Sequence, residues 1–470
     1  MFFSRIYDRK LAQASYLLGC QVTGEALVVD PNRDLAQYAA AAAAEKLRIR
    51  YVTETHIHAD FVSGARALAA EHGAELLLSA AGGVDWQYAF AKSSHARLLL
   101  DGDSFDVGRV RIAVLHTPGH TPEHLSFLVT DTVASPHPLL LLTGDFVFVG
   151  DVGRPDLLEK AAKQLNTMEA GGRTLWRSLA RFRALPDHVQ VWPGHGAGSA
   201  CGKSLGSVPA STIGYERLAN WGLTAGDEDS FVRLVLEGQP EPPAYFARMK
   251  RVNRDDPPLA GTPGTPSAVT RPQFERLQRE GAVVVDLRAA EAFAAGFVRG
   301  AINVPLSGGF TTYAGSAIPY DIPLVLLTPD EDGAHAAEAA RDLALIGFDS
   351  VAGRAGPSVL EHVPLLETIE RVAPEVAIAR YARGSRLVDV RNTTEWSLEH
   401  VRGAWHLPFP ELMARAGELP RDEPLLVQCQ TGSRSAIATS ILRRLGFTAA
   451  DAGGIVAWRA SGGPVESSPG

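Results

Sequence analysis

Histidine and acidic side chains follow several apolar runs in the first half of the chain. The densest motif is His56-x-His58-x-Asp60, where two imidazoles on one turn can reach the same ion and the carboxylate can bind or orient it. Further candidates come later, at His120 in TPGH, Asp145 in TGD and His195 in PGH. Each motif stands just after an expected strand, where loop residues can meet at one edge of a sheet. We therefore predict a metal site.

A cysteine loop is the second chemical feature. Cys429-Gln-Thr-Gly-Ser-Arg434 stands between an apolar run and an Ala-rich segment. Backbone N–H groups in such a loop, and the positive end of the following helix, stabilise a thiolate or a persulfide anion. Arg434 can add a charge-assisted contact to an anionic sulfur donor. A phosphatase loop would need an arginine at position 435, which is serine, so we predict sulfur chemistry carried by Cys429 and Arg434.

Short apolar runs between Gly- and Pro-rich turns must position the metal-binding motifs. An Ala-rich segment, 34–47, predicts a helix. The expected strands are residues 15–19, 26–30, 50–54, 76–79, 110–116, 125–129, 139–143 and 189–192. This pattern is typical of an α/β protein.

Two later segments repeat each other. Residues 283–305 and 387–408 each contain a strand, D-x-R, an acidic helix start and V-R-G-A. Their spacing of about 100 residues indicates tandem domains with mainly parallel sheets, since solenoid repeats are about 20–50 residues long. Where the second copy has its thiol loop, the first has LTPDEDG at 327–333. Without a cysteine this copy cannot carry a persulfide, so we expect a scaffold or an interface.

Length and composition limit the organisation of the chain. Its 470 residues suggest about three domains. The Pro/Gly-rich stretch 255–267 is the best candidate for a linker. We predict a first domain at 1–252 and a linker at 253–267. The copy without cysteine follows at 268–365 and the copy with cysteine at 375–470.

Charge and hydropathy exclude several classes of protein. With 46% hydrophobic and 21% charged residues, the chain is neither mainly disordered nor fibrous. A net charge of −8 gives no footprint for nucleic acid or an anionic membrane, and no apolar stretch approaches the ~20 residues of a membrane span. The N-terminus lacks the apolar core of a signal peptide, and Cys20, Cys201 and Cys429 are too few for a disulfide framework. We expect a cytoplasmic protein with Cys20 as a packing residue.

The metal-binding segments resemble a known superfamily. THIHADFVSG, HTPGHTPEH and LLTGDFVFVGDVGRPDL, in that order over residues 1–250, resemble the metallo-β-lactamase superfamily and, within it, the persulfide dioxygenase branch. Glyoxalase II, a thioester hydrolase, is the near relative. The two-metal hydrolases have a histidine directly after the motif's aspartate, where this chain has Phe61. A phenyl ring cannot bind a metal, so Phe61 favours a mononuclear site.

The resemblance implies a ligand set and a metal. It implies one Fe(II) per chain, with Zn as the alternative, held by His56, His120 and Asp145. Two imidazoles and one carboxylate leave three coordination positions open, and iron, unlike zinc, can take part in a redox step. The resemblance places three further residues around the ligands, where they orient them or move protons: His58, Asp60 and His195. His116 and His124 either line the pocket or make ordinary hydrogen bonds.

Three residues are weaker candidates for substrate binding. Arg154 stands in a G-R-x-D turn of this family, where it either contacts an anionic part of the substrate or forms a salt-bridged turn. Cys201 and Lys203 lie in the Gly-rich stretch 194–204, directly after a candidate metal-site histidine.

The flanks of both repeated segments resemble rhodanese, over about 268–365 and 375–465. The expected fold is therefore α/β: an N-terminal metallo-β-lactamase αββα sandwich followed by two rhodanese-like α/β domains. The expected enzyme is an iron persulfide dioxygenase with a sulfurtransferase, which oxidises low-molecular-weight thiol persulfides with dioxygen to sulfite or thiosulfate in sulfide detoxification. The resemblance also implies a homo-oligomer, a dimer or a tetramer.

Two other functions stay open at this point. One is a glyoxalase II-like zinc thioester hydrolase fused to a sulfurtransferase, against which Phe61 speaks. The other is a sulfur-carrier or partner-binding module, which an unreactive Cys429 would favour.

Overall fold

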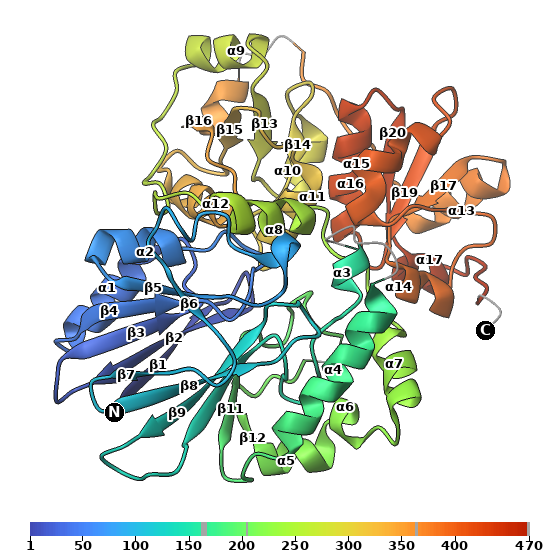
Figure 1. Ribbon diagram of the computed structural model, residues 1–470. Coiled ribbons are helices and arrows are strands. Elements are labelled where there is room, and N and C mark those ends of the chain that lie inside the picture. Colours follow the sequence, from blue (N-terminus) through green and yellow to red (C-terminus); the bar gives the residue numbers. More distant parts are fainter. Residues whose placement is uncertain (161–166, 204, 362–364, 468–470) are drawn as a thin grey trace. The chain divides into compact units, whose positions relative to one another are not determined.

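The computed structural model describes residues 1–160, 167–203, 205–361 and 365–467. The chain forms two compact units (Figure 1). The first consists of Met1–Thr262 with Leu345–Gly347, and the second of Pro263–Ala344 with Phe348–Gly470. The boundary at residue 262 lies inside the predicted linker. No helix within the described ranges is both long and apolar enough to span a membrane.

Two mixed sheets form the centre of the first unit, each with six strands in the described ranges. The first sheet has, in spatial order, β1 (Phe2–Asp8), β2 (Gln13–Cys20), β3 (Glu25–Val29), β4 (Arg48–Thr53), β5 (Glu75–Ser79) and β6 (Arg97–Leu99). The second has β12 (Ser211–Thr212), β11 (Gln190–Pro193), β10 (Leu140–Gly144), β9 (Leu125–Asp131), β8 (Val110–His116) and β7 (Ser104–Val107). All the strands expected from apolar runs are present.

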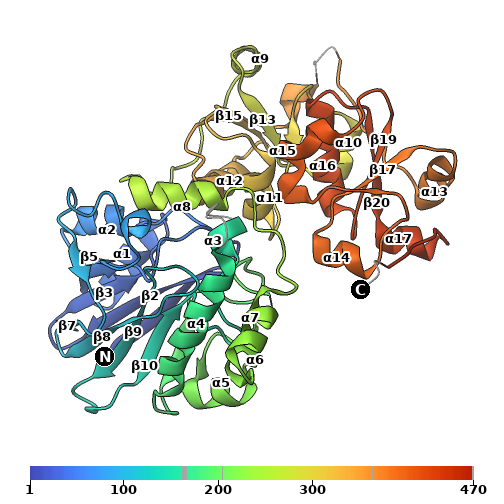
Figure 2. The same ribbon diagram turned by 45° about the vertical axis from the view of Figure 1, so that its right-hand side comes forward.

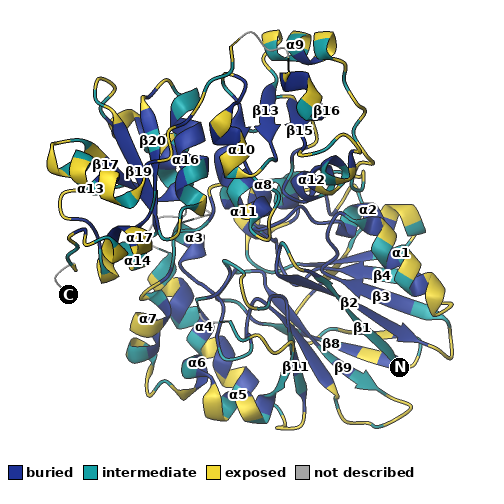
Figure 3. Cartoon of the chain, turned by 180° about the vertical axis from the view of Figure 1, so that it is seen from behind, coloured by how far each residue is buried: buried dark blue, intermediate teal, exposed yellow. Residues whose placement is uncertain are grey.

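Three hydrophobic clusters hold the layers of this unit together. The middle one lies between the sheets and contains buried side chains of both, such as Leu27 and Phe127. A second packs α1 (Leu35–Ala44) and α2 (Ala65–His72) on the first sheet. The third packs further helices on the second sheet (Figure 2). The layers therefore form the predicted αββα sandwich, with the inner strands mostly buried and the outer helix faces exposed (Figure 3).

The remaining helices of the first unit are one 3₁₀ turn between β5 and β6 and several helices after β10. They are η1 (Val84–Trp86), α3 (Leu157–Lys160), α4 (Met168–Arg183), α5 (Ile213–Ala219), α6 (Trp221–Thr224), α7 (Glu228–Leu236) and α8 (Phe246–Asp255). Helix α8 continues three residues into the segment predicted as linker. The reason is Asn253, which is buried and whose side-chain amide donates to the backbone oxygens of His58 and Phe61.

The second unit contains two parallel sheets of four strands among the described residues, and the two have the same strand order. The first has β14 (Ile302–Asn303), β13 (Val283–Asp286), β15 (Leu324–Leu327) and β16 (Val351–Ala355). The second has β18 (Trp405–His406), β17 (Arg386–Asp389), β19 (Leu425–Cys429) and β20 (Ala449–Gly454). Each sheet has its own hydrophobic cluster, which supports the prediction of two copies.

Short helices cover both sheets. Around the first lie α9 (Arg271–Arg279), α10 (Ala290–Ala295), α11 (Phe310–Ala317), α12 (Ala334–Leu345) and η2 (Pro357–Leu360). Around the second lie α13 (Pro374–Ala382), α14 (Thr393–Leu398), η3 (Phe409–Glu411), α15 (Leu412–Arg415), η4 (Ala416–Glu418), α16 (Ser433–Arg444) and α17 (Ile455–Ala460).

Candidate metal centre and thiol loop

His56, His120 and Asp145 meet in the first unit, although 89 residues separate the first from the last. His56 follows β4, His120 follows β8 and Asp145 directly follows β10. All three are buried, and Oδ2 of Asp145 lies 4.0 Å from Nε2 of His56 and 3.6 Å from Nε2 of His120. These distances are too long for hydrogen bonds. They agree with donors that share one ion, since bonds of about 2.0–2.2 Å place neighbouring ligand atoms about 3–4 Å apart.

Unsatisfied polar atoms provide a test of whether a metal fits. Neither carboxylate oxygen of Asp145 has a hydrogen-bond partner, although the side chain is fully buried. A buried carboxylate without a partner is costly, and a cation between these donors removes the cost. Two imidazoles and one carboxylate are a donor set for iron or zinc, so the residues fit the predicted metal.

The protonation state of the histidines also suits a metal. Burial and the neighbouring imidazoles hold the pKa of His56 well below its ordinary value, and burial lowers the pKa of His120. Both rings are therefore neutral near pH 7, the form in which imidazole binds metals.

Hydrogen bonds around the ligands fix their orientation. Nδ1 of His56 lies 2.9 Å from the hydroxyl of Thr55, which donates to Asp30. Nε2 of His58 lies 3.0 Å from the same carboxylate. Burial alone would lower the pKa of His58, but Asp30 outweighs it and raises that pKa to about 9. His58 is thus held by Asp30 beside the three-donor group, which supports an orienting role. Sequence reasoning missed Asp30.

The conformation of Asp145 depends on its neighbours. The Asp145 N–H donates to Nε2 of His124, whose Nδ1 lies 2.9 Å from the hydroxyl of Thr117. Gly144 has a φ of +49°, and a Cβ there would lie 2.6 Å from Oγ1 of Thr55. Only glycine therefore lets β10 end against the metal-binding turn. The ring of His116 instead lies 2.8 Å from the Pro122 carbonyl, so both extra histidines make ordinary hydrogen bonds.

A second donor group adjoins the first. Asp60, His195 and Cys201 are buried, and one donor atom of each lies within 4.8 Å of the others. Nε2 of His195 lies 3.4 Å from Oδ2 of Asp60 and 3.5 Å from Oδ1 of Asp145. Burial and the two carboxylates raise the pKa of the Cys201 thiol well above its ordinary value. The thiol is therefore protonated, and the predicted position of Cys201 beside the centre agrees with the structure.

Phe61 occupies the position where the two-metal hydrolases have a histidine. Its ring is fully buried, and its centroid lies 4.4 Å from that of His58. It contributes packing but no ligand to the second group.

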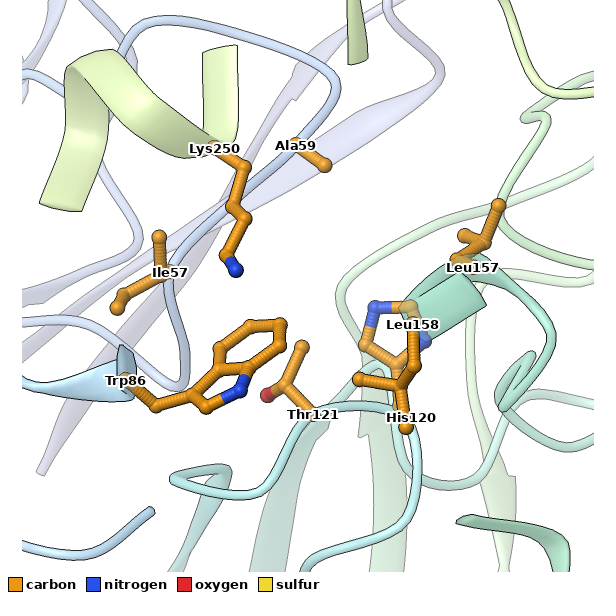
Figure 4. A pocket seen from close by; sticks show the side chains of 8 residues that line it. All are labelled: Ile57, Ala59, Trp86, His120, Thr121, Leu157, Leu158 and Lys250. Carbon is orange, nitrogen blue, oxygen red and sulfur yellow. The ribbon is translucent and has the colours of Figure 1, made fainter. Parts of the chain in front are cut away.

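A small pocket opens beside His120 (Figure 4). Its volume is about 20 Å³, enough for one small group. Apolar side chains dominate the lining, which consists of Ile57, Ala59, Trp86, His120, Thr121, Leu157, Leu158 and Lys250. The Lys250 ammonium lies 3.7 Å from the centroid of the Trp86 ring. No sequence motif marks this lysine, because it comes from α8, far along the chain.

Arg154 and Lys203 make structural contacts. The Arg154 side chain is fully buried, binds Asp156 with two hydrogen bonds and donates to the carbonyls of Ala200 and Pro240. The geometry thus favours the salt-bridged turn over substrate contact. Lys203 donates to two carbonyls at the end of α7 and lies 4.4 Å from the Trp221 ring centroid, which favours a structural role for it too.

We expect Arg154→Met to lower the stability of the first unit by about 3 kcal/mol near neutral pH, since it leaves a buried carboxylate poorly paired. Burial would raise the pKa of Asp156, yet Arg154 holds it below its usual range. The pair therefore stabilises the fold at pH values above the pKa that Asp156 has in the unfolded chain. This contribution is lost as the pH falls through the lower pKa that Asp156 has in the folded chain. Urea unfolding followed by circular dichroism measures the loss of unfolding free energy in the variant. This loss becomes smaller in acid, where Asp156 is protonated. Arg111→Met, in an exposed pair with Asp106, is the control expected to show no change. Equal midpoints for both variants would contradict the prediction.

The thiol loop begins at Cys429, the last residue of β19, and leads into α16. The sulfur is buried and accepts a hydrogen bond from the N–H of Gly432 at 3.1 Å. Gly432 has a φ of +113°, a conformation that glycine adopts without strain. The loop therefore turns one backbone donor, the N–H of Gly432, toward the sulfur.

Arg434 has a partner that the sequence did not reveal. Its two terminal nitrogens bind both oxygens of Glu395 at 2.7 and 2.6 Å. Glu395 stands in the first turn of α14, where Asn392 caps the helix. The Arg434 guanidinium thus binds Glu395 and is not free to contact an anionic sulfur donor. Cys20, by contrast, is buried and accepts the Arg109 N–H, as expected for a packing residue.

Comparisons with known proteins match both parts of the chain. The family model for the metallo-beta-lactamase superfamily matches residues 8–195, and that for the rhodanese-like domain matches residues 373–461. The solved metallo-beta-lactamase from Staphylococcus aureus subsp. aureus COL is 40% identical, and the alignment covers 76% of this chain and 99% of that one with a TM-score of 0.68.

Curated relatives cover less of the chain. The mitochondrial persulfide dioxygenase ETHE1 of Bos taurus is 28% identical over 49% of this chain and 79% of its own length. The hydroxyacylglutathione hydrolase of Rhodospirillum rubrum is 32% identical over 38% of this chain and 60% of its own length. Other curated relatives are matched over 54% of their length, so the chain spans about half of them. The identity to the solved relative extends over nearly all of that chain, and this chain therefore belongs to the metallo-β-lactamase superfamily and carries a rhodanese-like domain after its N-terminal metallo-β-lactamase domain.

Proposed function

We propose that the first unit is an iron-dependent persulfide dioxygenase and that Cys429 is the nucleophile of a sulfurtransferase. The observation that carries the proposal is the buried group of His56, His120 and Asp145 together with Phe61, which stands where the two-metal hydrolases have a further histidine ligand. The rhodanese-like domain with its thiol loop supplies a second sulfur chemistry in the same chain. A relative described as a persulfide dioxygenase supports the first part.

In the proposed reaction a thiol persulfide, dioxygen and water give the thiol and sulfite. Four electrons pass from the outer sulfur to dioxygen, which balances the reaction. Iron held by His56, His120 and Asp145 would supply the redox chemistry that zinc lacks. The apolar lining of the adjacent pocket excludes water from the outer sulfur, and the ammonium of Lys250 offers a positive charge to the persulfide anion. Asp30, through Thr55 and His58, keeps the ligand rings in place.

The sulfurtransferase step needs no redox partner. The Cys429 thiolate attacks the outer sulfur of a persulfide, the S–S bond breaks, and the carrier leaves as a thiolate with the electron pair of that bond. The N–H of Gly432 stabilises the anionic sulfur on Cys429 before and after the transfer. Sulfite can then take the sulfur from Cys429 to give thiosulfate, which regenerates the thiolate.

Metal loading combined with oxygen uptake tests the dioxygenase. Protein reconstituted without air is expected to bind one Fe(II) per chain and to consume one dioxygen per glutathione persulfide. Zinc-loaded protein is expected to consume none, because zinc does not change its oxidation state. An oxygen electrode and metal analysis measure both quantities. Iron-loaded protein that consumes no oxygen with any persulfide would overturn the proposal.

Thioester hydrolysis is the second candidate, and one observation favours it. Asp60, His195 and Cys201 form a further donor group beside the first, and a two-metal hydrolase needs a second ion. Zinc-loaded protein that hydrolyses an acyl-glutathione thioester, together with two metals per chain, would select this function instead.

A further inference from the structure

A pocket of about 370 Å³ lies beside the thiol loop within the second unit. One wall is the loop itself and the start of α16, with Thr431, Gly432, Ser433 and Ile437. The opposite wall comes from the copy without cysteine, with Ala289, Ala290, Glu291, Pro305, Ser307 and Tyr313. Arg371, from the segment that joins the copies, completes the lining. The cysteine-less copy therefore supplies about half of the surroundings of the sulfurtransferase site.

Direct contacts hold the two walls together. The N–H of Asn303 donates to the hydroxyl of Ser440 in α16, a buried hydrogen bond of 3.1 Å. The ring of Tyr313 packs edge-on against Phe409 with a centroid distance of 5.7 Å. The first contact joins β14 to α16 and the second joins α11 to η3, so the wall is part of the fold of this unit.

Two opposite charges in the lining of the pocket form an ion pair. The Arg371 guanidinium binds the carboxylate of Glu291 and also reaches Asp451. The Arg371 side chain is 42% exposed and that of Glu291 is 68% exposed. An ion pair this exposed contributes little to stability, so a ligand can separate the two charges at low cost. By contrast, the nearby pair of Arg434 and Glu395 is mostly buried and bidentate, and it stays closed.

The size of the pocket indicates what it holds. A volume of about 370 Å³ falls in the range of pockets for small organic ligands, and it is several times larger than a sulfite ion needs. The pocket therefore suits the body of the molecule that brings the sulfur. A carboxylate of that molecule would contact Arg371, and an ammonium would contact Glu291.

We propose that this pocket binds the carrier of the transferred sulfur, a low-molecular-weight thiol persulfide with a carboxylate and an ammonium group, and that Arg371 and Glu291 select it by charge. The cysteine-less copy is then the carrier-binding half of the sulfurtransferase. The assignment rests on the proposed function of Cys429. Binding places the outer sulfur at Cys429, whose thiolate forms the new S–S bond while the old one breaks and the carrier thiolate leaves.

Two probes of opposite charge test the selection in the full chain. The persulfide of 3-mercaptopropionate carries only a carboxylate, and that of cysteamine carries only an ammonium. Arg371→Gln is expected to lower the kcat/KM of sulfur transfer from the carboxylate probe about fivefold and to raise it for the ammonium probe. Glu291→Gln is expected to raise the kcat/KM for the carboxylate probe and to lower it for the ammonium probe. Opposite effects of one variant on the two probes indicate selection by charge. A variant that only loosens the wall of the pocket would slow sulfur transfer from both probes.

A control and the overturning results complete the experiment. Arg380 forms a similar exposed pair with Glu370 outside the pocket, and Arg380→Gln is expected to affect neither probe. Sulfur loading on Cys429 is followed by mass spectrometry of the intact chain. If the unmodified protein loads Cys429 from neither probe nor from glutathione persulfide, the sulfurtransferase function is wrong and the pocket assignment falls with it. If loading occurs but each variant changes the kcat/KM for both probes in the same direction, or for neither, the pocket assignment alone is wrong.

Discussion

Replacing His120 with glutamine is expected to reduce iron binding to a small fraction of one per chain and to lower oxygen uptake at least about 100-fold. Changes to residues that only orient a ligand cost about 10–100-fold, and His120 is one of the three donors themselves. The loss leaves Oδ2 of Asp145 with one neighbouring imidazole, that of His56, instead of two. Metal analysis after reconstitution and an oxygen electrode with glutathione persulfide give the two values.

His116→Gln is the matched control for this variant. His116 lies near His120 in sequence but binds the Pro122 carbonyl outside the donor group, so its replacement is expected to keep both iron and oxygen uptake. Circular dichroism establishes that each variant folds. Full iron content and undiminished oxygen uptake in the His120 variant would contradict the ligand assignment.

The grouping of the candidate site residues could be predicted because each one stands in a local motif just after an expected strand. Asp145 and His195 each stand just after an apolar strand, and the parallel pairing of β10 with β11 brings these two strand ends to one edge of the second sheet. The repeated D-x-R and V-R-G-A segments likewise predicted two sheets, and their strand orders are the same. The first strand, β1, was missed, because its partly exposed side chains show no clear apolar alternation.

The partners of the predicted residues could not be found in the same way. Asp30 reaches His58 only because β3 and β4 are neighbours in the sheet. Glu395 and Arg434 are 39 residues apart, and either residue alone looks like a solvent-exposed charge. Lys250 enters the pocket beside His120 from a helix about 130 residues later. Such contacts depend on tertiary packing, which leaves no pattern in a local window of sequence.

Cys429→Ser is expected to lower sulfur transfer at least about 1000-fold, as the loss of a nucleophile does in other enzymes, while oxygen uptake continues. A serine hydroxyl stays protonated at neutral pH and cannot hold a sulfane sulfur as a stable persulfide. Transfer assayed with thiosulfate as donor and cyanide as acceptor measures the first effect. Cys20→Ser is the matched control, because Cys20 is also buried and accepts a backbone N–H, yet belongs to neither donor group and not to the thiol loop.

The products of the same variant test whether the two activities act in sequence. If sulfite formed in the first unit takes sulfur from Cys429, the unmodified protein makes thiosulfate from a persulfide and oxygen, and Cys429→Ser makes sulfite instead. Joining both activities in one chain raises the effective concentration of sulfite at Cys429, so this shift should persist when the protein is diluted. Mixing the His120 variant with the Cys429 variant restores both activities on separate chains, and we expect less thiosulfate from this mixture at low protein concentration. An unchanged ratio of sulfite to thiosulfate in Cys429→Ser would show that the sulfurtransferase acts on other substrates.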